Sequence, residues 1–332
     1  MKRQKFFVKT FLIFYFMLAI VAFFFLALAD FNGDLTRLGK LSEYAFGWKK
    51  KKPKIDPNLL KSSSFKDSDI VVVGDSFSEK FIWQTRLTKN NYKVKTIDWE
   101  ELDQKLCTDF EELLISHNFR GKLIIIETVQ RMAEIRASAS LSCDSSKTLL
   151  DYESTMNPPL ISLPKFGLNF KEKIITGIET FFNTIKAVSN PHADSIFIEK
   201  DGGHRVALKP LKKGCKWFSN RYCEIGVFLD NDLDFPSLTN NTIDKIKKIN
   251  ASFHQFKIVW LVVPDKSSIY TEREELEFWK ELEKNNLGPD LFSSFIKERD
   301  KIVDLYLPND THLSSAGSLF MGELAKQWIE TH

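Results

Sequence analysis

The sequence has very little net charge and lacks the residue spacings that mark several kinds of binding site. Its 47 lysine and arginine residues against 44 aspartate and glutamate residues leave a net charge of +3, so a nucleic-acid-binding surface is not expected. No two cysteines have CxxC spacing, which argues against a zinc ribbon and a thioredoxin-type site. No histidine pair or carboxylate cluster has metal-ligand spacing, so neither a metal nor another cofactor is expected.

Long apolar runs are also scarce, and this excludes a multi-span transporter. Residues 11–29 form the only run that is long and apolar enough to span a bilayer. The chain is 43% hydrophobic and 27% charged, which is typical of a folded protein rather than a disordered or fibrous one. Its 332 residues predict one large domain or two ordinary ones.

The apolar run predicts a transmembrane anchor. It carries no charge and, at about 1.5 Å per residue, nearly matches a hydrocarbon core of about 30 Å. The basic residues of the segment 1–10 predict a cytoplasmic N-terminus and export of the rest of the chain. A cleaved signal peptide is the alternative, because residues 27–29 (ALA) resemble a cleavage site, although signal cores are usually shorter. We expect a single-pass protein of the bacterial inner (plasma) membrane, with a periplasmic or otherwise extracytoplasmic main domain.

The four cysteines are compatible with export. An even number of cysteines in an exported chain permits two disulfides. Cys215 and Cys223 would close a short loop and form the favoured pair, which leaves Cys107 for Cys143. Four buried free thiols are the alternative that the sequence leaves open.

Residues 30–68 are expected to be a linker between the anchor and the main domain. They contain the lysine-rich run 49–54 and a serine triplet at 62–64. A lysine run of this kind is most often a solvated linker, and contact with anionic lipid or with an acidic polymer is the alternative.

The main domain is expected at 69–332, with an α/β fold. Short apolar runs predict buried strands at 69–74, 93–98, 122–127, 256–263 and 302–305. Amphipathic spacing predicts helices from about 79, at 100–117, at 272–285 and at 313–329. This alternation predicts a parallel sheet with helices on both faces. The stretch at about 132–253 interrupts the alternation with a helix near 171–187 and a hairpin that turns at 201–203, so it is expected to be an insertion.

The first predicted strand leads into a serine at a strand-to-helix turn. Ser76 follows Gly74, which permits a tight turn, and ligands of open α/β sheets bind beyond the carboxyl ends of the strands. Backbone N–H groups at the start of the next helix can stabilise an oxyanion. Ser76 is therefore placed as a nucleophile, although a serine needs a neighbouring base, and the same turn also occurs as a plain helix cap.

His312 is the candidate base. It lies directly after the last predicted strand and before the last predicted helix, so its loop opens at the same sheet edge as the Ser76 turn. Asp310, two residues earlier, is placed to orient the imidazole and to stabilise its protonated form. Taken singly, His312 could be a solvent-facing residue and Asp310 or Thr311 a helix cap. Together the two motifs predict a Ser76–His312–Asp310 site.

The segments GDSFS (74–78) and DTHLS (310–314) resemble the SGNH/GDSL hydrolase family. The resemblance covers about 69–130 and 256–330. It implies a three-layer α/β/α sandwich of SGNH or flavodoxin-like type, with Ser76 as nucleophile and His312 and Asp310 completing the triad. The family's usual spacing is Asp-x-x-His, whereas Asn309 stands at that position here.

The Asp-x-His spacing resembles alginate O-acetylation proteins and related exported acetyltransferases, in which this motif precedes the nucleophile. The segments 127–131 and 264–270 are similar to the Glu-x-x-x-Arg and Pro-x-Lys-x-x-x-Tyr segments of that branch. The family's separate glycine and asparagine oxyanion donors are not evident. The resemblance makes four residues candidates for binding substrate or the oxyanion: Arg131, Lys266, Tyr270 and Glu127. The alternative is an ion pair between Glu127 and Arg131, one helical turn apart.

The resemblance implies a serine O-acetyltransferase that modifies a cell-surface or exported polysaccharide through an acyl-serine. Its partners would be an acyl donor, a polysaccharide acceptor and a multi-span membrane acyltransferase. The alternatives are an exported SGNH carbohydrate acetylesterase and a catalytically inactive SGNH-like protein that binds glycan or acts as a scaffold.

Overall fold

The computed structural model describes residues 2–146, 149, 153–156, 167–192, 196–199, 205–233, 238–271 and 276–332. The chain divides into two compact units. Unit 1 comprises Met1–Lys50, Leu163–Asn231 and Leu307–Thr311. Unit 2 comprises Lys51–Ser162, Asp232–Tyr306 and His312–His332.

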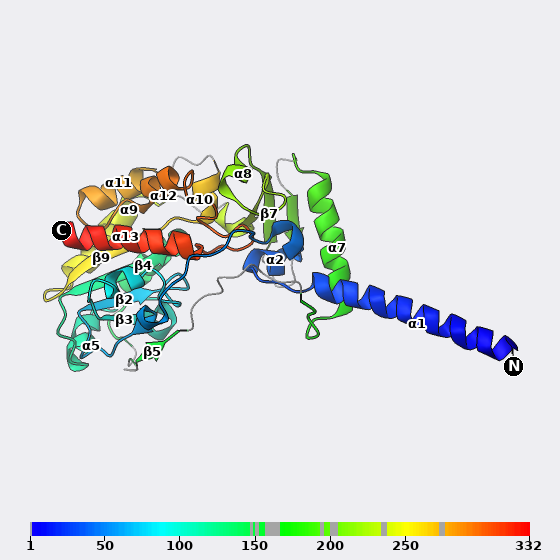
Figure 1. Cartoon of the computed structure of the whole chain (residues 1–332). Helices are drawn as coiled ribbons and strands as arrows, with labels where there is room; N and C mark the ends of the chain where they lie inside the picture. The colour runs from blue at the N-terminus through cyan, green and yellow to red at the C-terminus, as the bar shows by residue number, and fades with distance from the viewer. Residues whose placement is uncertain are drawn as a thin grey trace. The chain divides into compact units, whose positions relative to one another are not determined.

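Unit 2 is built on a parallel sheet of four strands, in the order β3-β2-β4-β9 (Figure 1). The strands are β2 (Ile70–Gly74), β3 (Val94–Asp98), β4 (Leu123–Val129) and β9 (Lys257–Val263). Every residue of β2 is buried, as expected for a strand that is covered on both faces. The predicted α/β class and these four predicted strands are confirmed.

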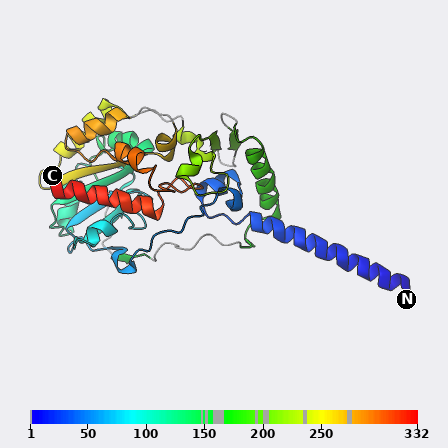
Figure 2. The same ribbon diagram turned by 45° about the horizontal axis from the view of Figure 1, so that its top comes forward.

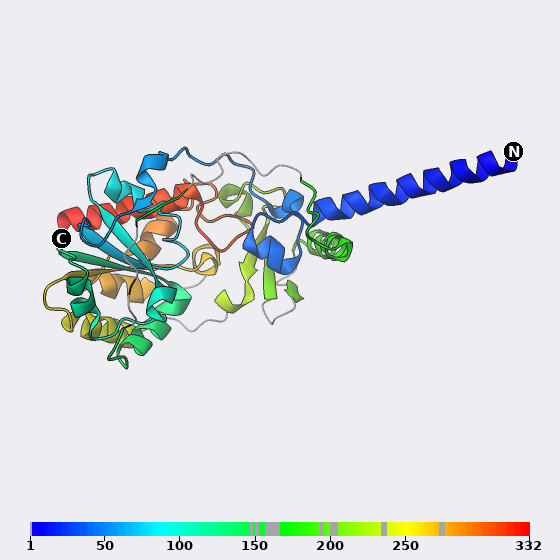
Figure 3. The ribbon, with the colours of Figure 1, turned by 90° about the horizontal axis from the view of Figure 1, so that it is seen from below.

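Helices cover the sheet from two sides. The strand order reverses after β3, and right-handed crossovers then put the connections before and after that point on opposite faces. The short helix α4 (Thr85–Thr88) packs against α13 (Ser315–Thr331), whereas α6 (Gln130–Ser140) packs on β4 and β9. Figure 3 shows α13 on one side of the sheet and α6 on the other.

Unit 2 contains further short elements. The other helices are α5 (Phe110–Ser116), α9 (Asn240–Ala251), α10 (Lys266–Tyr270), α11 (Leu276–Lys284) and α12 (Leu291–Glu298). Two 3₁₀ turns, Pro57–Leu59 and Trp99–Leu102, and the antiparallel pair β1 (Lys61–Ser62) and β5 (Ser154–Thr155) complete it.

Three predicted elements of unit 2 were wrong or too long. The predicted strand 302–305 consists of turns, because Asp304 adopts a left-handed conformation, with φ of 58°, inside a very short apolar run. The predicted helix 100–117 is interrupted because Asp103 and Gln104 have φ of 51° and 62°. Phe81, with φ of 54°, likewise delays the helix expected from 79, which begins only at Thr85.

Unit 1 contains the apolar N-terminal helix α1 (Lys2–Leu28). Among the described residues it is the one helix long and apolar enough to span a membrane, and none of its apolar window is buried. The other helices of unit 1 are α2 (Asp34–Gly39), α3 (Glu43–Phe46), α7 (Ile174–Ser189) and α8 (Gly214–Trp217). The chain passes from unit 1 to unit 2 in the 3₁₀ turn Asp230–Asp232.

An antiparallel sheet forms the other part of unit 1. Its strands are β6 (Ile196–Glu199), β7 (Arg205–Pro210) and β8 (Ile225–Leu229), in sequence order. The predicted hairpin is therefore present, and its predicted turn at 201–203 lies outside the described residues. Leu35, Leu41 and Phe46 are fully buried in one hydrophobic cluster with strands β7 and β8. The first part of the segment expected as a linker thus contributes to a hydrophobic core.

Both predicted cysteine pairs are disulfides. Cys107 pairs with Cys143 in unit 2 and Cys215 with Cys223 in unit 1, each with a Cα–Cα distance of 4.6 Å. The alternative of four free thiols is therefore wrong. Disulfides together with a membrane-compatible helix fit a protein whose folded part lies in an oxidising compartment.

Removing the longer disulfide loop is expected to cost more stability. The Cys107–Cys143 bridge joins residues 36 apart and the Cys215–Cys223 bridge residues 8 apart. Loop-closure entropy in the unfolded chain predicts losses of about 4 kcal/mol for Cys107→Ala/Cys143→Ala and about 2.5 kcal/mol for Cys215→Ala/Cys223→Ala. Urea unfolding of both double variants measures the difference, and a larger loss at the shorter loop would contradict the entropic explanation.

Candidate active site

Ser76 lies in a tight turn directly after β2. A Cβ atom at Gly74 would overlap Ser78 Oγ, so the turn has no room for a larger residue. The Asp75 side chain accepts the Phe77 N–H at 3.1 Å, and the Asp75 carbonyl accepts the Ser78 N–H at 2.7 Å. These bonds fix the backbone on both sides of Ser76 and leave its side chain exposed to solvent.

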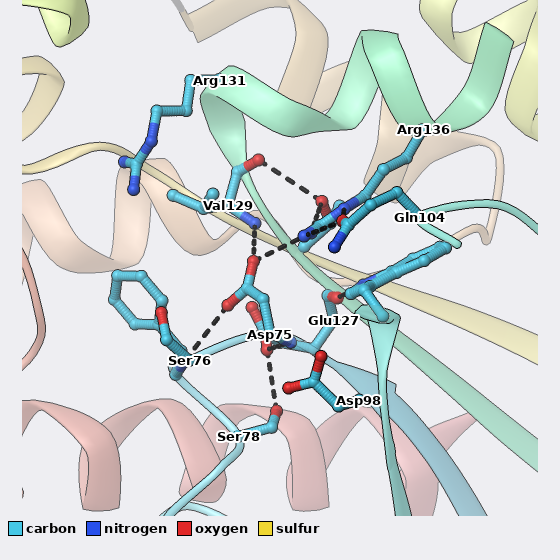
Figure 4. Close-up of polar contacts among 12 residues, drawn as sticks. Asp75, Ser76, Ser78, Asp98, Gln104, Glu127, Val129, Arg131 and Arg136 are labelled. Carbon is cyan, nitrogen blue, oxygen red and sulfur yellow. Dashed lines mark hydrogen bonds and ion pairs between the residues drawn. The ribbon is translucent and has the colours of Figure 1, made fainter. Parts of the chain in front are cut away.

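A buried ion pair joins this turn to α6. Asp75 Oδ2 accepts the Val129 N–H at 3.0 Å and a bond from Arg136 Nη1 at 2.9 Å (Figure 4). Arg136 also donates to Gln104 Oε1 from Nε and Nη2, and its guanidinium lies 4.7 Å from the centre of the Trp99 ring. Asp75 is thus held between the ends of β2 and β4 by donors that leave its carboxylate little freedom.

Glu127 of the neighbouring strand β4 accepts hydrogen bonds from the turn. It is fully buried in β4, and its Oε2 accepts the Asp75 N–H at 3.0 Å and the Ser78 hydroxyl at 2.8 Å (Figure 4). Trp83 Nε1 donates to the same Ser78 oxygen at 2.9 Å. Burial raises the pKa of Glu127 well above its usual range, and the negative charge of Asp75 raises it further. The protonated form of this carboxyl is therefore favoured.

The stability of Glu127→Gln relative to that of the wild type is expected to increase as pH rises. Because the folded-state pKa of Glu127 is raised, its stabilisation is fully present below the unfolded pKa, near 4.5, and is lost as pH rises through the folded pKa. Glutamine keeps an acceptor and never ionises, so it avoids a loss of at most about 1.4 kcal/mol per pH unit. Thermal unfolding measured from about pH 4.5 upward, through the range in which the folded-state carboxyl ionises, measures the effect. Glu112→Gln, on an exposed position of α5, is the control, and equal pH slopes for Glu127→Gln and wild type would contradict the expectation.

The structure brings His312 to Ser76. His312 Nε2 lies 2.7 Å from Ser76 Oγ, although the two residues are 236 positions apart in the sequence. The imidazole ring is half-buried and lies 5.1 Å from the Phe77 ring, measured between ring centres. The N-cap of α13 is Ser314, whose hydroxyl accepts the Gly317 N–H, so neither Asp310 nor Thr311 caps that helix.

Asp310 belongs to unit 1. There its Oδ2 accepts the Asp34 N–H at 3.2 Å, and the Asp310 side chain is half-buried. Its role as the acid that orients His312 stays a prediction from the sequence.

One backbone donor lies next to the Ser76 hydroxyl. The N–H groups of Asp75, Phe77, Ser78 and Glu79 all have acceptors. Within the part of the chain that the structure describes, the Ser76 N–H is the one amide of residues 75–79 that has no hydrogen-bond partner. It is therefore available to a developing oxyanion on an acyl group bound to Ser76.

Of the four substrate-binding candidates, only Arg131 retains solvent access. Its Nη1 lies 2.6 Å from Asp265 Oδ1 and 3.5 Å from Asp232 Oδ1, and its side chain is 22% exposed. Arg131 therefore pairs with these aspartates, and not with Glu127 as the helical alternative predicted.

The other three candidates are buried, which favours structural roles over contact with substrate. Lys266 is 1%, Tyr270 3% and Glu127 0% exposed. The Tyr270 hydroxyl accepts the Tyr306 N–H at 3.4 Å, and burial raises the pKa of Tyr270 above its usual range.

Two residues of this site, Arg136 and Gln104, were not predicted from the sequence. The signal for Arg136 is its position on the face of α6 that carries the small residues Ala133, Ala137 and Ser140, all of which are buried. A charged residue on such a face needs a buried partner, and Asp75 is that partner. Nothing in its local sequence marks Gln104, which is brought in by the left-handed turn before α5.

One group of potential metal ligands lies outside this site. It consists of Cys215, Cys223 and Glu224, and both sulfur atoms are used by the disulfide. These cysteines are therefore not available as thiolate ligands.

No protein-family profile matches this chain, and comparisons with curated proteins and with solved structures find no match either.

Proposed function

We propose that this protein is a membrane-anchored serine O-acetyltransferase of SGNH type that modifies a cell-surface or exported polysaccharide. The observation that carries the proposal is the Ser76–His312 pair, with 2.7 Å between hydroxyl and imidazole. This distance is in the range of about 2.6–3.2 Å expected of a nucleophile and its base. The exposed Ser76 side chain lies beyond the carboxyl end of β2, which is where open parallel sheets bind their ligands.

The proposed reaction has two acyl-transfer steps. Ser76 Oγ attacks the acyl carbonyl of the donor while His312 Nε2 takes the serine proton, and the Ser76 N–H stabilises the oxyanion. His312 then returns the proton to the departing donor group, which leaves an ester on Ser76. A sugar hydroxyl attacks this ester, gives its proton to His312 and leaves with the acyl group, and the proton returns to Ser76. Asp310 is the acid that the sequence assigns to His312.

Several features support this reading over a glycan-binding scaffold. A scaffold has no need of an exposed serine bonded to an imidazole, or of a turn held by a buried ion pair. The parallel sheet with helices on both sides supports a three-layer SGNH sandwich.

The anchor favours transfer over hydrolysis. We place α1 in the bacterial inner membrane with its N-terminus in the cytoplasm and both disulfide-bonded units outside it. A tethered enzyme there can receive acyl groups from a multi-span membrane acyltransferase and pass them to a polysaccharide. An exported acetylesterase would use the same serine and histidine, with water in place of the sugar.

The acyl-serine intermediate is the direct test. The full chain in detergent micelles is mixed with p-nitrophenyl acetate, quenched and digested, and mass spectrometry locates the acetyl group. We expect acetyl on Ser76 in the wild type and none on that peptide in His312→Ala. Acetylated oligosaccharide in the presence of acceptors would identify a transferase, and release of acetate alone an esterase. Absence of acetyl-Ser76 under rapid quenching would favour the scaffold.

A further inference from the structure

Helix α7 of unit 1 lies crosswise to the membrane-compatible helix α1. Helix α1 is seen from the side in Figures 1, 2 and 3. Helix α7 runs across the direction of α1 at its C-terminal end in Figures 1 and 2, and is seen end-on there in Figure 3. If α1 runs across a bilayer, a helix crossing it lies roughly parallel to the membrane surface. The position of α7 is therefore that of an interfacial helix.

The two helices are packed closely at this crossing. A Cβ atom at Gly177 would overlap the Phe25 carbonyl oxygen, so only glycine permits this approach of the backbones. The ring of Phe181 lies 6.1 Å and 6.3 Å from the rings of Phe24 and Phe25. Helix α1 is thus part of the folded unit, which argues against its removal as a signal peptide.

A second face of α7 is apolar and is left exposed by the residues of unit 1 that the structure describes. Four large apolar residues of the helix are between 43% and 63% exposed: Ile174, Ile175, Phe182 and Ile185. At about 3.6 residues per turn they fall within an arc of about 100°. The buried residues Gly177, Thr180 and Ala187 lie on a different arc. Phe170, just before the helix, is 70% exposed and lies 6.3 Å from the ring of Phe23.

The depth of this face matches the boundary between lipid headgroups and acyl chains. Phe23 and Phe25 are four to six residues before Ala29, the end of the apolar run. At about 1.5 Å per residue this is about 6–9 Å inside the membrane edge. Interfacial helices bury their apolar face about 5–10 Å into this boundary.

The same junction contains a cavity. It has a volume of about 810 Å³, and apolar side chains of both helices line it, among them Phe24, Leu28, Phe181, Ile185 and Val188. Exposed lysines flank the apolar face at Lys171, Lys173 and Lys186. Cations beside an apolar face fit the headgroups of anionic phospholipids.

We propose that α7, with the residues 168–173 before it, is an interfacial membrane helix whose exposed apolar face is covered by the lipid of the bilayer that α1 spans. The continuity of this face with the apolar surface of α1 selects lipid as the occupant. Unit 1 then has two membrane contacts, and rests on the membrane surface instead of hanging from a single helix.

Depth-dependent quenching tests this proposal. Simple vesicle binding does not, because α1 holds the protein in the membrane in either case. The native cysteines are all in disulfides, so a single introduced cysteine takes a thiol-reactive fluorophore selectively. Phe182→Cys and Ile175→Cys place the fluorophore on the apolar face. Lys212→Cys is the control, because this residue of unit 1 is exposed and comes just before α8, a helix that lies apart from α1 and α7 (Figure 1). The full chain is reconstituted in phosphatidylcholine–phosphatidylglycerol vesicles.

We expect the labels at 175 and 182 to show blue-shifted emission and several-fold stronger quenching by headgroup-proximal nitroxide lipids than by aqueous iodide. The label at 212 should show the opposite order. Iodide quenching of all three labels to the same extent would overturn the proposal. Shielding of the labels at 175 and 182 from both quenchers would also overturn it, since protein, a second copy for example, would then cover the face.

Discussion

Ser76→Ala and His312→Ala should each lower kcat/KM for p-nitrophenyl acetate by about 10³-fold or more. The serine supplies the atom that becomes acylated, so alanine removes the intermediate altogether. The imidazole is 2.7 Å from that atom and takes its proton, so its loss leaves an unactivated alcohol. Rates of nitrophenol release by the full chain in detergent micelles measure both effects.

The double variant tests whether the two residues act as a unit. Ser76→Ala/His312→Ala should be no slower than the less active single variant, because either substitution alone already removes the activated nucleophile. Ser116→Ala and His254→Ala are the matched controls, since both side chains are exposed in unit 2 and both should leave the rate unchanged. Equal rates for the wild type and both site variants would mean that the bonded pair is not used for acyl transfer.

Ser76 was predictable from its position directly after β2, whereas the strand expected before His312, at 302–305, consists of turns. The strands β2, β4 and β9 are short apolar runs followed within two residues by the polar residues Asp75, Gln130 and Asp265, and the carboxyl ends of parallel strands lie at one edge of the sheet. The helices that follow β2 and β3 were harder to predict. Phe81 delays the first helix and Asp103 interrupts the second, and both residues are left-handed without being the glycine that usually marks such positions.

The hydrogen-bond and ion-pair partners of the charged residues around the site could not be predicted from the sequence. The resemblance made Arg131 and Lys266 candidates for binding substrate, yet Arg131 pairs with Asp265 and Lys266 is buried. Which of two arginines on α6 reaches Asp75 depends on the rotation of the helix against the sheet. Spacing alone could not distinguish Arg131 from Arg136, one of which faces the buried side of that helix.

Arg136→Met is expected to be strongly destabilising, by about 3–5 kcal/mol. Both partners of the Arg136–Asp75 pair are buried, with side chains 4% and 11% exposed, so methionine leaves the carboxylate without its countercharge in a site of low polarity. The unpaired Asp75 would then hold the Ser76 turn less firmly, so activity should fall as well. Lys284→Met is the matched control, because the Lys284–Glu281 pair is exposed on α11 and its loss should hardly move the urea midpoint.

A second substitution separates the lost charge pair from lost packing. In Arg136→Met/Asp75→Asn both charges are gone, and asparagine Oδ1 can still accept the Phe77 N–H. We expect this double variant to recover part of the stability that Arg136→Met loses, since a buried charge without a partner costs more than a neutral pair. If urea unfolding showed that Arg136→Met costs no more than Lys284→Met, the ion pair would not be what fixes the turn. If the double variant were as unstable as the sum of the single ones, packing of the guanidinium on Trp99 would be the larger contribution.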